Sequence, residues 1–133
     1  MKRSHFLTLA SAIAVGVGAF ALLAPAQLLY SKGAPPDPLA AVWIREVGVL
    51  LIALAVLAFG VRTQDDSPTL RVVLACNALV QLGLLPIEIV ACARGVLGSV
   101  GGIIPNTVVH VVLGSVFGYY AARCRVDGER DAD

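Results

Sequence analysis

Four long apolar stretches dominate the chain, and short polar or glycine- and proline-rich segments separate them. Each stretch reaches the roughly 20 residues that an α-helix needs to cross the hydrocarbon core of a bilayer. An aspartate or serine followed by proline precedes the second and third stretches, which is typical of a helix N-cap and the first helical residue. The pattern therefore predicts four membrane-spanning helices, at about residues 6–30, 38–62, 68–94 and 104–124.

Composition supports a bilayer environment. Hydrophobic residues make up 58% of the 133 residues and charged residues only 14%, whereas soluble domains carry about 25% charged residues. A soluble chain of this size has too little interior to hide so much apolar surface. The predicted partner is the lipid bilayer. The net charge of +1 provides no basic field, so nucleic acid is not predicted as a partner.

The first stretch has an alternative interpretation as a secretory signal. Lys2 and Arg3 precede an apolar run at 7–23, and Ala24-Pro25-Ala26 resembles a small-residue cleavage site. The apolar run is longer than the roughly 7–15 residues of a usual signal core. We therefore expect a retained span, and cleavage of residues 1–26 stays open as the alternative.

Lysine and arginine are distributed unevenly between the two predicted sides of the membrane. Seven fall on the side of the N-terminus and two on the other side. The positive-inside rule then places both termini in the cytoplasm, with the spans in a bacterial inner (cytoplasmic) membrane. The seven are Lys2, Arg3, Arg62, Arg71, Arg123, Arg125 and Arg130, and the two are Lys32 and Arg94.

Short loops make consecutive spans antiparallel neighbours. The predicted fold is therefore all-α, an integral membrane up-down-up-down four-helix bundle over residues 1–126. Residues 127–133 are charged and lack apolar content, which predicts a disordered cytoplasmic tail. Gly114 and Gly118 form a G-x-x-x-G pair. Such a pair is typical of close helix packing, either inside one chain or at a homodimer seam.

Three ionisable residues on three predicted spans lie at one depth. Arg45, Glu88 and His110 are each five to seven residues from the predicted outer end of their helix, which is roughly 8–10 Å. A charge inside hydrocarbon is unfavourable unless it is paired. We therefore expect Arg45 to meet Glu88, since a guanidinium pairs well with a carboxylate. The adjacent Glu46 would then point elsewhere, and Arg45 reaching outward to lipid phosphate stays open as the alternative.

Helical spacing adds amides to this cluster. On the third span, Asn77, Gln81 and Glu88 are separated by four and seven residues and share one face. On the fourth span, Asn106 and His110 are four apart and share a face. The predicted polar cluster, either ligand-binding or structural, consists of Arg45, Glu88, His110, Asn106, Gln81 and Asn77.

The cluster favours three classes of function. The first is an accessory or scaffold subunit of a larger membrane complex, whose register a polar cluster would fix. The second is a pocket in the outer half of the membrane for a small amphiphile such as a lipid or quinone. A proton-coupled transporter ranks third, because a paired carboxylate is a poor proton carrier. No catalytic residue is predicted, the cofactor is left unknown, and a metal site from Glu88, Cys92 and His110 stays open as a minor alternative.

Several segments resemble small bacterial four-span membrane proteins of the DoxX-like type. They are "APAQLLYSKG", "WIREVGVLLIALAVLAFGVR" and "DSPTLRVVLACNALVQLG", followed by a last span with a central histidine. The order Arg45, Asn77, His110 is also similar to that in small four-span scaffold proteins of sterol synthesis. The resemblance covers roughly residues 20–122. It implies a four-helix integral membrane fold and an accessory role beside a membrane redox or lipid enzyme.

Overall fold

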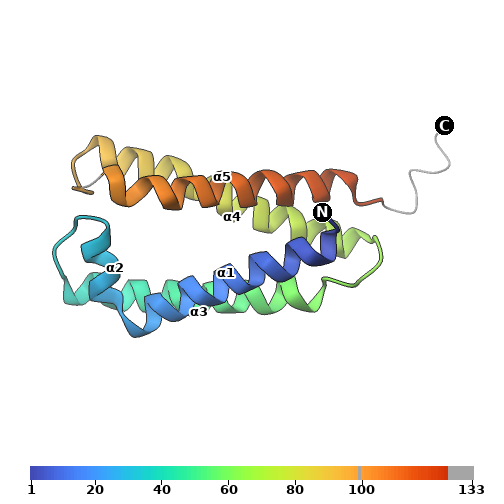
Figure 1. The fold of residues 1–133 in the computed structure, drawn as a ribbon, viewed down its shortest axis with the longest axis horizontal. Coiled ribbons are helices and arrows are strands. Elements are labelled where there is room, and N and C mark those ends of the chain that lie inside the picture. Colours follow the sequence, from blue (N-terminus) through green and yellow to red (C-terminus); the bar gives the residue numbers. More distant parts are fainter. Residues whose placement is uncertain (99, 126–133) are drawn as a thin grey trace.

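The computed structural model describes residues 1–98 and 100–125, and all regular secondary structure in that part of the chain is helical (Figure 1). This confirms the all-α fold class. The predicted tail at 127–133 lies outside the described residues. The helices of the described part are α1 (Arg3–Leu23), α2 (Pro25–Ser31), α3 (Pro38–Gly60), α4 (Pro68–Ala93) and α5 (Val100–Arg123). Four of these, α1, α3, α4 and α5 from Gly101 onward, are long and apolar enough to cross a membrane.

The two predicted N-caps are confirmed. The Asp37 carboxylate accepts a hydrogen bond from the Ala40 backbone N–H at 2.6 Å, and Pro38 is the first residue of α3. The Ser67 hydroxyl accepts from the Leu70 N–H at 3.2 Å, and Pro68 begins α4. Each cap satisfies a backbone donor that the first helical turn leaves without a partner.

The predicted first span is divided in two. Ala24 leaves the helical region, with φ −136° and ψ 51°, and Pro25 starts the short helix α2. The cause is Pro25, which has no N–H and whose ring disfavours the helical conformation at the residue before it. As a result the chain turns after α1, and α2 leads from the end of α1 toward the pair formed by α4 and α5 (Figure 1).

The last helix begins earlier than predicted. The sequence places its start at about 104, whereas α5 begins at Val100 and contains Pro105. The glycines at 101 and 102 adopt helix instead of loop. Gly102 is required for a close approach, because a Cβ there would collide with the Ser31 carbonyl oxygen. Contact with the end of α2 therefore accounts for a glycine in the first turn of α5.

The long helices pack as two pairs (Figure 1). In the N-terminal pair, α1 crosses α3 where Gly18 meets Gly48, so that a Cβ on either glycine would lie 2.8 Å from the other's carbonyl oxygen. In the C-terminal pair, α4 packs on α5, where Gly114 lies against the Leu82 side chain. Gly118, the second glycine of the G-x-x-x-G motif, has nothing within 4 Å of its Cβ position.

The two pairs meet at the end of the molecule that holds the N-terminus, here called the closed end. Its core includes Phe6, Leu7, Leu70, Leu74 and Phe117, all nearly fully buried. The rings of Phe6 and Phe117 pack edge to face, with centroids 4.8 Å apart, a favoured aromatic geometry. This core joins α1, α4 and α5, so the two pairs are held together here.

Polar contacts fasten the same end. Arg3 forms an ion pair with Asp66 and donates to the Gln64 carbonyl oxygen. Asp66 also accepts from the Arg125 backbone N–H at 3.0 Å, and the Tyr120 hydroxyl donates to the Met1 carbonyl oxygen at 2.6 Å. These bonds lower the pKa of Asp66, first through the Arg3 side chain and then through the Arg125 N–H.

The lowered pKa of Asp66 predicts a pH dependence of folding stability. The stabilisation is present above the unfolded-state pKa and is lost as pH falls below about 4. Because Asp66 is partly exposed, we expect Asp66→Asn to cost under about 1 kcal/mol near neutral pH. Reversible unfolding in detergent should show that the difference in free energy of unfolding between the native chain and Asp66→Asn becomes smaller as the pH is lowered. Asp65→Asn is the control, and an equal effect of that variant would contradict the assignment.

Candidate binding cavity

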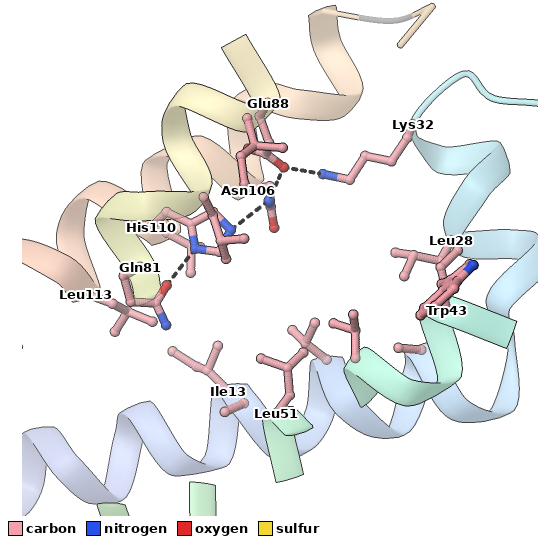
Figure 2. A pocket seen from close by; sticks show the side chains of 18 residues that line it. Ile13, Leu28, Lys32, Trp43, Leu51, Gln81, Glu88, Asn106, His110 and Leu113 are labelled. Atoms are coloured by element: carbon pink, nitrogen blue, oxygen red, sulfur yellow. Dashed lines mark hydrogen bonds and ion pairs between the residues drawn. The ribbon is translucent and has the colours of Figure 1, made fainter. Parts of the chain in front are cut away.

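A cavity of about 330 Å³ separates the two helix pairs on the α2 side of the closed-end core (Figure 2). All five helices contribute to its lining, together with Lys32, the C-cap of α2. The lining residues outside the polar groups are aliphatic or aromatic. Two features shape the space: the pairs are joined at the closed end, and at the other end α2 and α5 touch through Ser31 and Gly102.

The N-terminal pair provides an apolar wall. Ile13 and Val17 on α1 lie beside Trp43, Val47 and Leu51 on α3. Figure 2 shows Ile13, Leu51 and Trp43 across the cavity from the polar residues of the C-terminal pair. An apolar wall of this kind favours the hydrocarbon part of a ligand.

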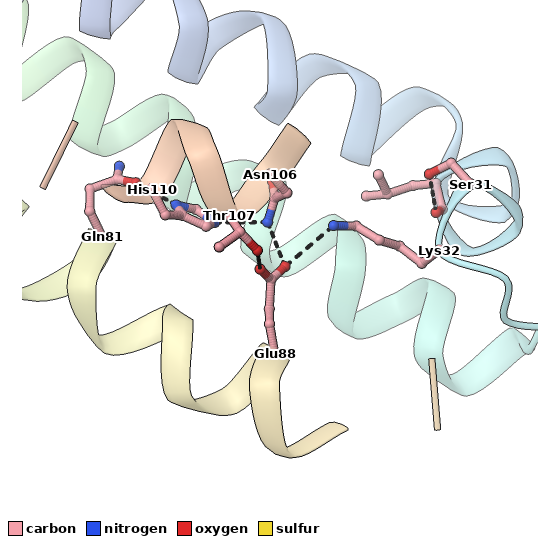
Figure 3. A network of polar contacts seen from close by, with 8 residues as sticks. Ser31, Lys32, Gln81, Glu88, Asn106, Thr107 and His110 are labelled. Carbon is pink, nitrogen blue, oxygen red and sulfur yellow. Dashed lines mark hydrogen bonds and ion pairs between the residues drawn. The ribbon is translucent and has the colours of Figure 1, made fainter. Parts of the chain in front are cut away.

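The C-terminal pair provides a polar wall. Gln81 and Glu88 lie two turns apart on α4, and Asn106 and His110 lie one turn apart on α5. Hydrogen bonds join these four residues with Lys32 and Thr107 into one polar network (Figure 3). The four polar residues of α4 and α5 that line the cavity were all predicted as members of one cluster.

Glu88 is the centre of the polar network. Its Oε1 accepts from the Lys32 ammonium at 3.3 Å and from the Asn106 amide, and its Oε2 accepts from the Thr107 hydroxyl at 3.4 Å. The Lys32 and Glu88 side chains are 19% and 16% exposed, so this is a largely buried ion pair. An ionised carboxylate accepts several hydrogen bonds and donates none, which fits all three contacts.

The contacts of His110 define its tautomer. Gln81 Oε1 can only accept, so His110 Nδ1 carries the proton of that bond. The Asn106 amide nitrogen, 2.9 Å from Nε2, can only donate, so Nε2 is the acceptor. With these orientations of the two amides, the contacts fit a neutral imidazole that carries its proton on Nδ1. The two hydrogens of the Asn106 amide go to His110 and to Glu88, which gives the polar network one consistent direction.

The predicted pairing of Arg45 with Glu88 is wrong. Arg45 is exposed on α3 and lines no part of the cavity, and Lys32 is the cation that contacts Glu88. The side of α3 that faces the cavity carries Ile44 and Val47 instead. Docking of Gly48 against Gly18 sets the rotation of α3, and this rotation points Arg45 away from α4.

Asn77 lies apart from the polar network. It is buried nearer the closed end, and its amide donates to the Val73 carbonyl oxygen of its own helix at 2.9 Å. Together with Gln81 it lines a second cavity of only about 20 Å³. Of the six predicted cluster residues, the structure therefore joins Gln81, Glu88, Asn106 and His110 and leaves Arg45 and Asn77 outside.

Lys32 and Thr107 were not predicted as members of the cluster. The sequence pattern places Lys32 only among the two cations of the outer side. The signal that could have found it is the Ala24-Pro25 break, because a chain that turns there can return its next cation to the bundle. Thr107 follows Asn106 directly and faces Glu88 from the other side.

A groove that is separate from both of these cavities lies on the opposite side of Glu88. It measures about 430 Å³ and is lined by α4 and α5 residues that include Cys92, Ile103 and Thr107. Glu88 borders both spaces. Within residues 1–98 and 100–125, no three His, Cys, Asp or Glu side chains lie close enough to hold a metal ion. The metal site considered from Glu88, Cys92 and His110 is therefore not formed.

A scan against protein-family models and searches of the curated proteins and the solved structures find no match.

Proposed function

We propose that this chain is a multi-pass protein of the bacterial inner membrane, an up-down-up-down four-helix bundle with both termini in the cytoplasm. Four helices of spanning length and apolarity support the insertion. The excess of lysine and arginine at the closed end supports the orientation. In this arrangement the cavity lies in the outer half of the membrane, and the short connections at 33–37 and 94–98 face outward.

We further propose that the cavity binds a small amphiphile, such as a lipid or a quinone. The observation that carries this proposal is the division of one cavity into an apolar wall and a polar wall. The ligand tail would lie along Val17, Val47 and Leu51. Its polar head would exchange hydrogen bonds with Glu88 and His110. A volume of about 330 Å³ lies at the lower end of the range for small-molecule sites.

Trp43 offers a direct test, because it is the only tryptophan and it lines the cavity. Purified protein in detergent is titrated with brominated stearic acid, a quencher of tryptophan fluorescence, and with brominated chains carrying phosphocholine or alcohol heads. We expect saturable quenching near one equivalent for at least one head group. Ala14→Phe fills the cavity and should weaken that quenching several-fold.

The matched control is Ala12→Phe, which adds the same ring to α1 at an exposed position outside the cavity. It should leave the titration unchanged. Quenching that rises linearly with added quencher, or that is equal in the two variants, would show simple partition into the micelle and reject the proposal.

An accessory or scaffold subunit is the second candidate. It is favoured by the pairing inside the polar network: within the described part of the chain, none of its buried nitrogen or oxygen atoms lacks a hydrogen-bond partner. A network whose buried polar atoms all have partners can fix helix register without any ligand. The resemblance to DoxX-like four-span proteins supports the same role. Native mass spectrometry after gentle extraction separates the candidates, since a scaffold co-purifies with a larger protein and a binding protein with an amphiphile.

A further inference from the structure

Arg45 and Glu46 are two charged side chains on α3 that the polar network does not use. Both are exposed, and both lie seven or eight residues from the start of the helix at Pro38. Within residues 1–98 and 100–125 neither forms an ion pair or a side-chain hydrogen bond. In the proposed membrane topology, two adjacent opposite charges therefore face outward from a spanning helix.

Such charges are unfavourable in hydrocarbon unless they are paired. Arg45 has a long stem that can carry its guanidinium toward the lipid head groups. Glu46 has only two methylene groups, and it lies about 12 Å along the helix from Pro38. Glu46 therefore needs a cationic partner close to its own depth. Arg45 of the same chain does not serve, because adjacent residues project about 100° apart on a helix.

The helix face that carries Glu46 has the spacing of a helix–helix seam. Its residues are separated by four and three in alternation, which is the repeat of a left-handed helix pair. All of them are exposed, and they lie opposite the side on which Gly48, Ala55 and Ala58 are buried. This α3 outer face consists of Val42, Glu46, Val49, Ala53, Val56 and Gly60.

We propose that the α3 outer face docks on the same face of a second copy of this chain. The inference depends on the proposed membrane topology. Two copies with one orientation in a membrane are related by a two-fold axis along the membrane normal, so their α3 helices are parallel. Arg45, which flanks the seam, then reaches Glu46 of the second copy at the same depth, and the symmetry repeats the pair. Each dimer contains two such pairs and no net charge from them.

Charge reversal tests this complementarity. With Arg45→Glu each copy has two acidic residues at the seam, and with Glu46→Arg each copy has two basic residues there. In a dimer of either variant, like charges therefore face each other. We expect each variant alone to lose the dimer that the native chain forms in mild detergent. Co-expressed with different tags, the two variants should pair with each other, because every acid then meets a base. Failure of the mixed pair to form, or native-like dimers of either variant alone, would overturn the proposal.

Cysteine cross-linking tests the geometry with the native charges in place. Ala53→Cys, in a chain with Cys76, Cys92 and Cys124 changed to alanine, should form intermolecular disulfides in membranes. The control keeps Cys76, which is exposed on α4, and retains Ala53. We expect several-fold more cross-linked dimer at Ala53→Cys, and equal yields would reject the seam.

The outcomes separate this inference from the proposed function. If zwitterionic lipid head groups meet Arg45 and Glu46 instead, the native chain is monomeric and the mixed variants do not pair, which rejects the dimer. Alkaline carbonate extraction reports insertion independently. Protein that stays in the membrane without dimerising rejects only this inference. Protein that carbonate removes rejects the membrane topology as well.

Discussion

Gly48→Leu is expected to separate α1 from α3 and to give a large loss of stability. The Cβ of any residue at 48 would lie 2.8 Å from the Gly18 carbonyl oxygen and 2.9 Å from Leu22 Cγ. A backbone carbonyl cannot move aside as a side chain can. We expect a loss of about 3 kcal/mol or more in the free energy of unfolding, at the upper end of overpacking effects. Reversible unfolding in mixed micelles measures it.

The control for this substitution is Gly16→Leu. Gly16 lies on α1 two residues from Gly18, and its Cβ position has nothing within 4 Å. Leucine has a higher helix propensity than glycine, so this variant should be neutral or slightly more stable. Similar losses at positions 16 and 48 would indicate a general intolerance of these helices to leucine and contradict the proposed crossing.

Removal of the Lys32 side chain is expected to have the second large effect. Lys32→Ala leaves the Glu88 carboxylate with only neutral hydrogen-bond donors in a largely buried position. Removing one partner of a buried ion pair typically costs 3–5 kcal/mol. We expect about 3 kcal/mol, since both side chains keep some exposure. The double variant Lys32→Ala with Glu88→Gln should recover most of this loss, because a neutral amide needs no counter-charge.

Arg45→Ala is the matched control for Lys32→Ala. Both substitutions remove one cation, but Arg45 is exposed and does not contact Glu88. Measured on the monomer, its effect should stay within about 0.5 kcal/mol, as for other surface changes. A larger loss with Arg45→Ala than with Lys32→Ala would restore the pairing that the sequence predicts and reject the one in the structure.

The sequence predicts the polar wall well because helical periodicity alone determines it. Gln81 and Glu88 share a face of α4, and Asn106 and His110 share a face of α5, whatever the helices pack against. Similar distances from the helix ends then bring the two faces to one level. The caps at Asp37 and Ser67 were predictable for the same reason, since a cap depends on residues within one turn.

The cation beside Glu88 could not be predicted in this way. Arg45 and Glu46 are adjacent, and only the contact of Gly48 with Gly18 determines which way α3 is rotated. Periodicity also treats the first apolar stretch as one straight helix. The turn at Ala24 and Pro25 instead directs Lys32 into the bundle. The positions of Arg45 and Lys32 both depend on how the helices contact one another. The pattern of residues along a single helix does not reveal such contacts.

The Asn106 amide serves two acceptors on the polar wall. Its nitrogen donates to Glu88 Oε1 and lies 2.9 Å from His110 Nε2. Because one side chain serves both groups, any change that moves or removes this amide withdraws a donor from the carboxylate and from the imidazole at once. The polar wall therefore responds to a change at Asn106 as one unit and not as separate residues.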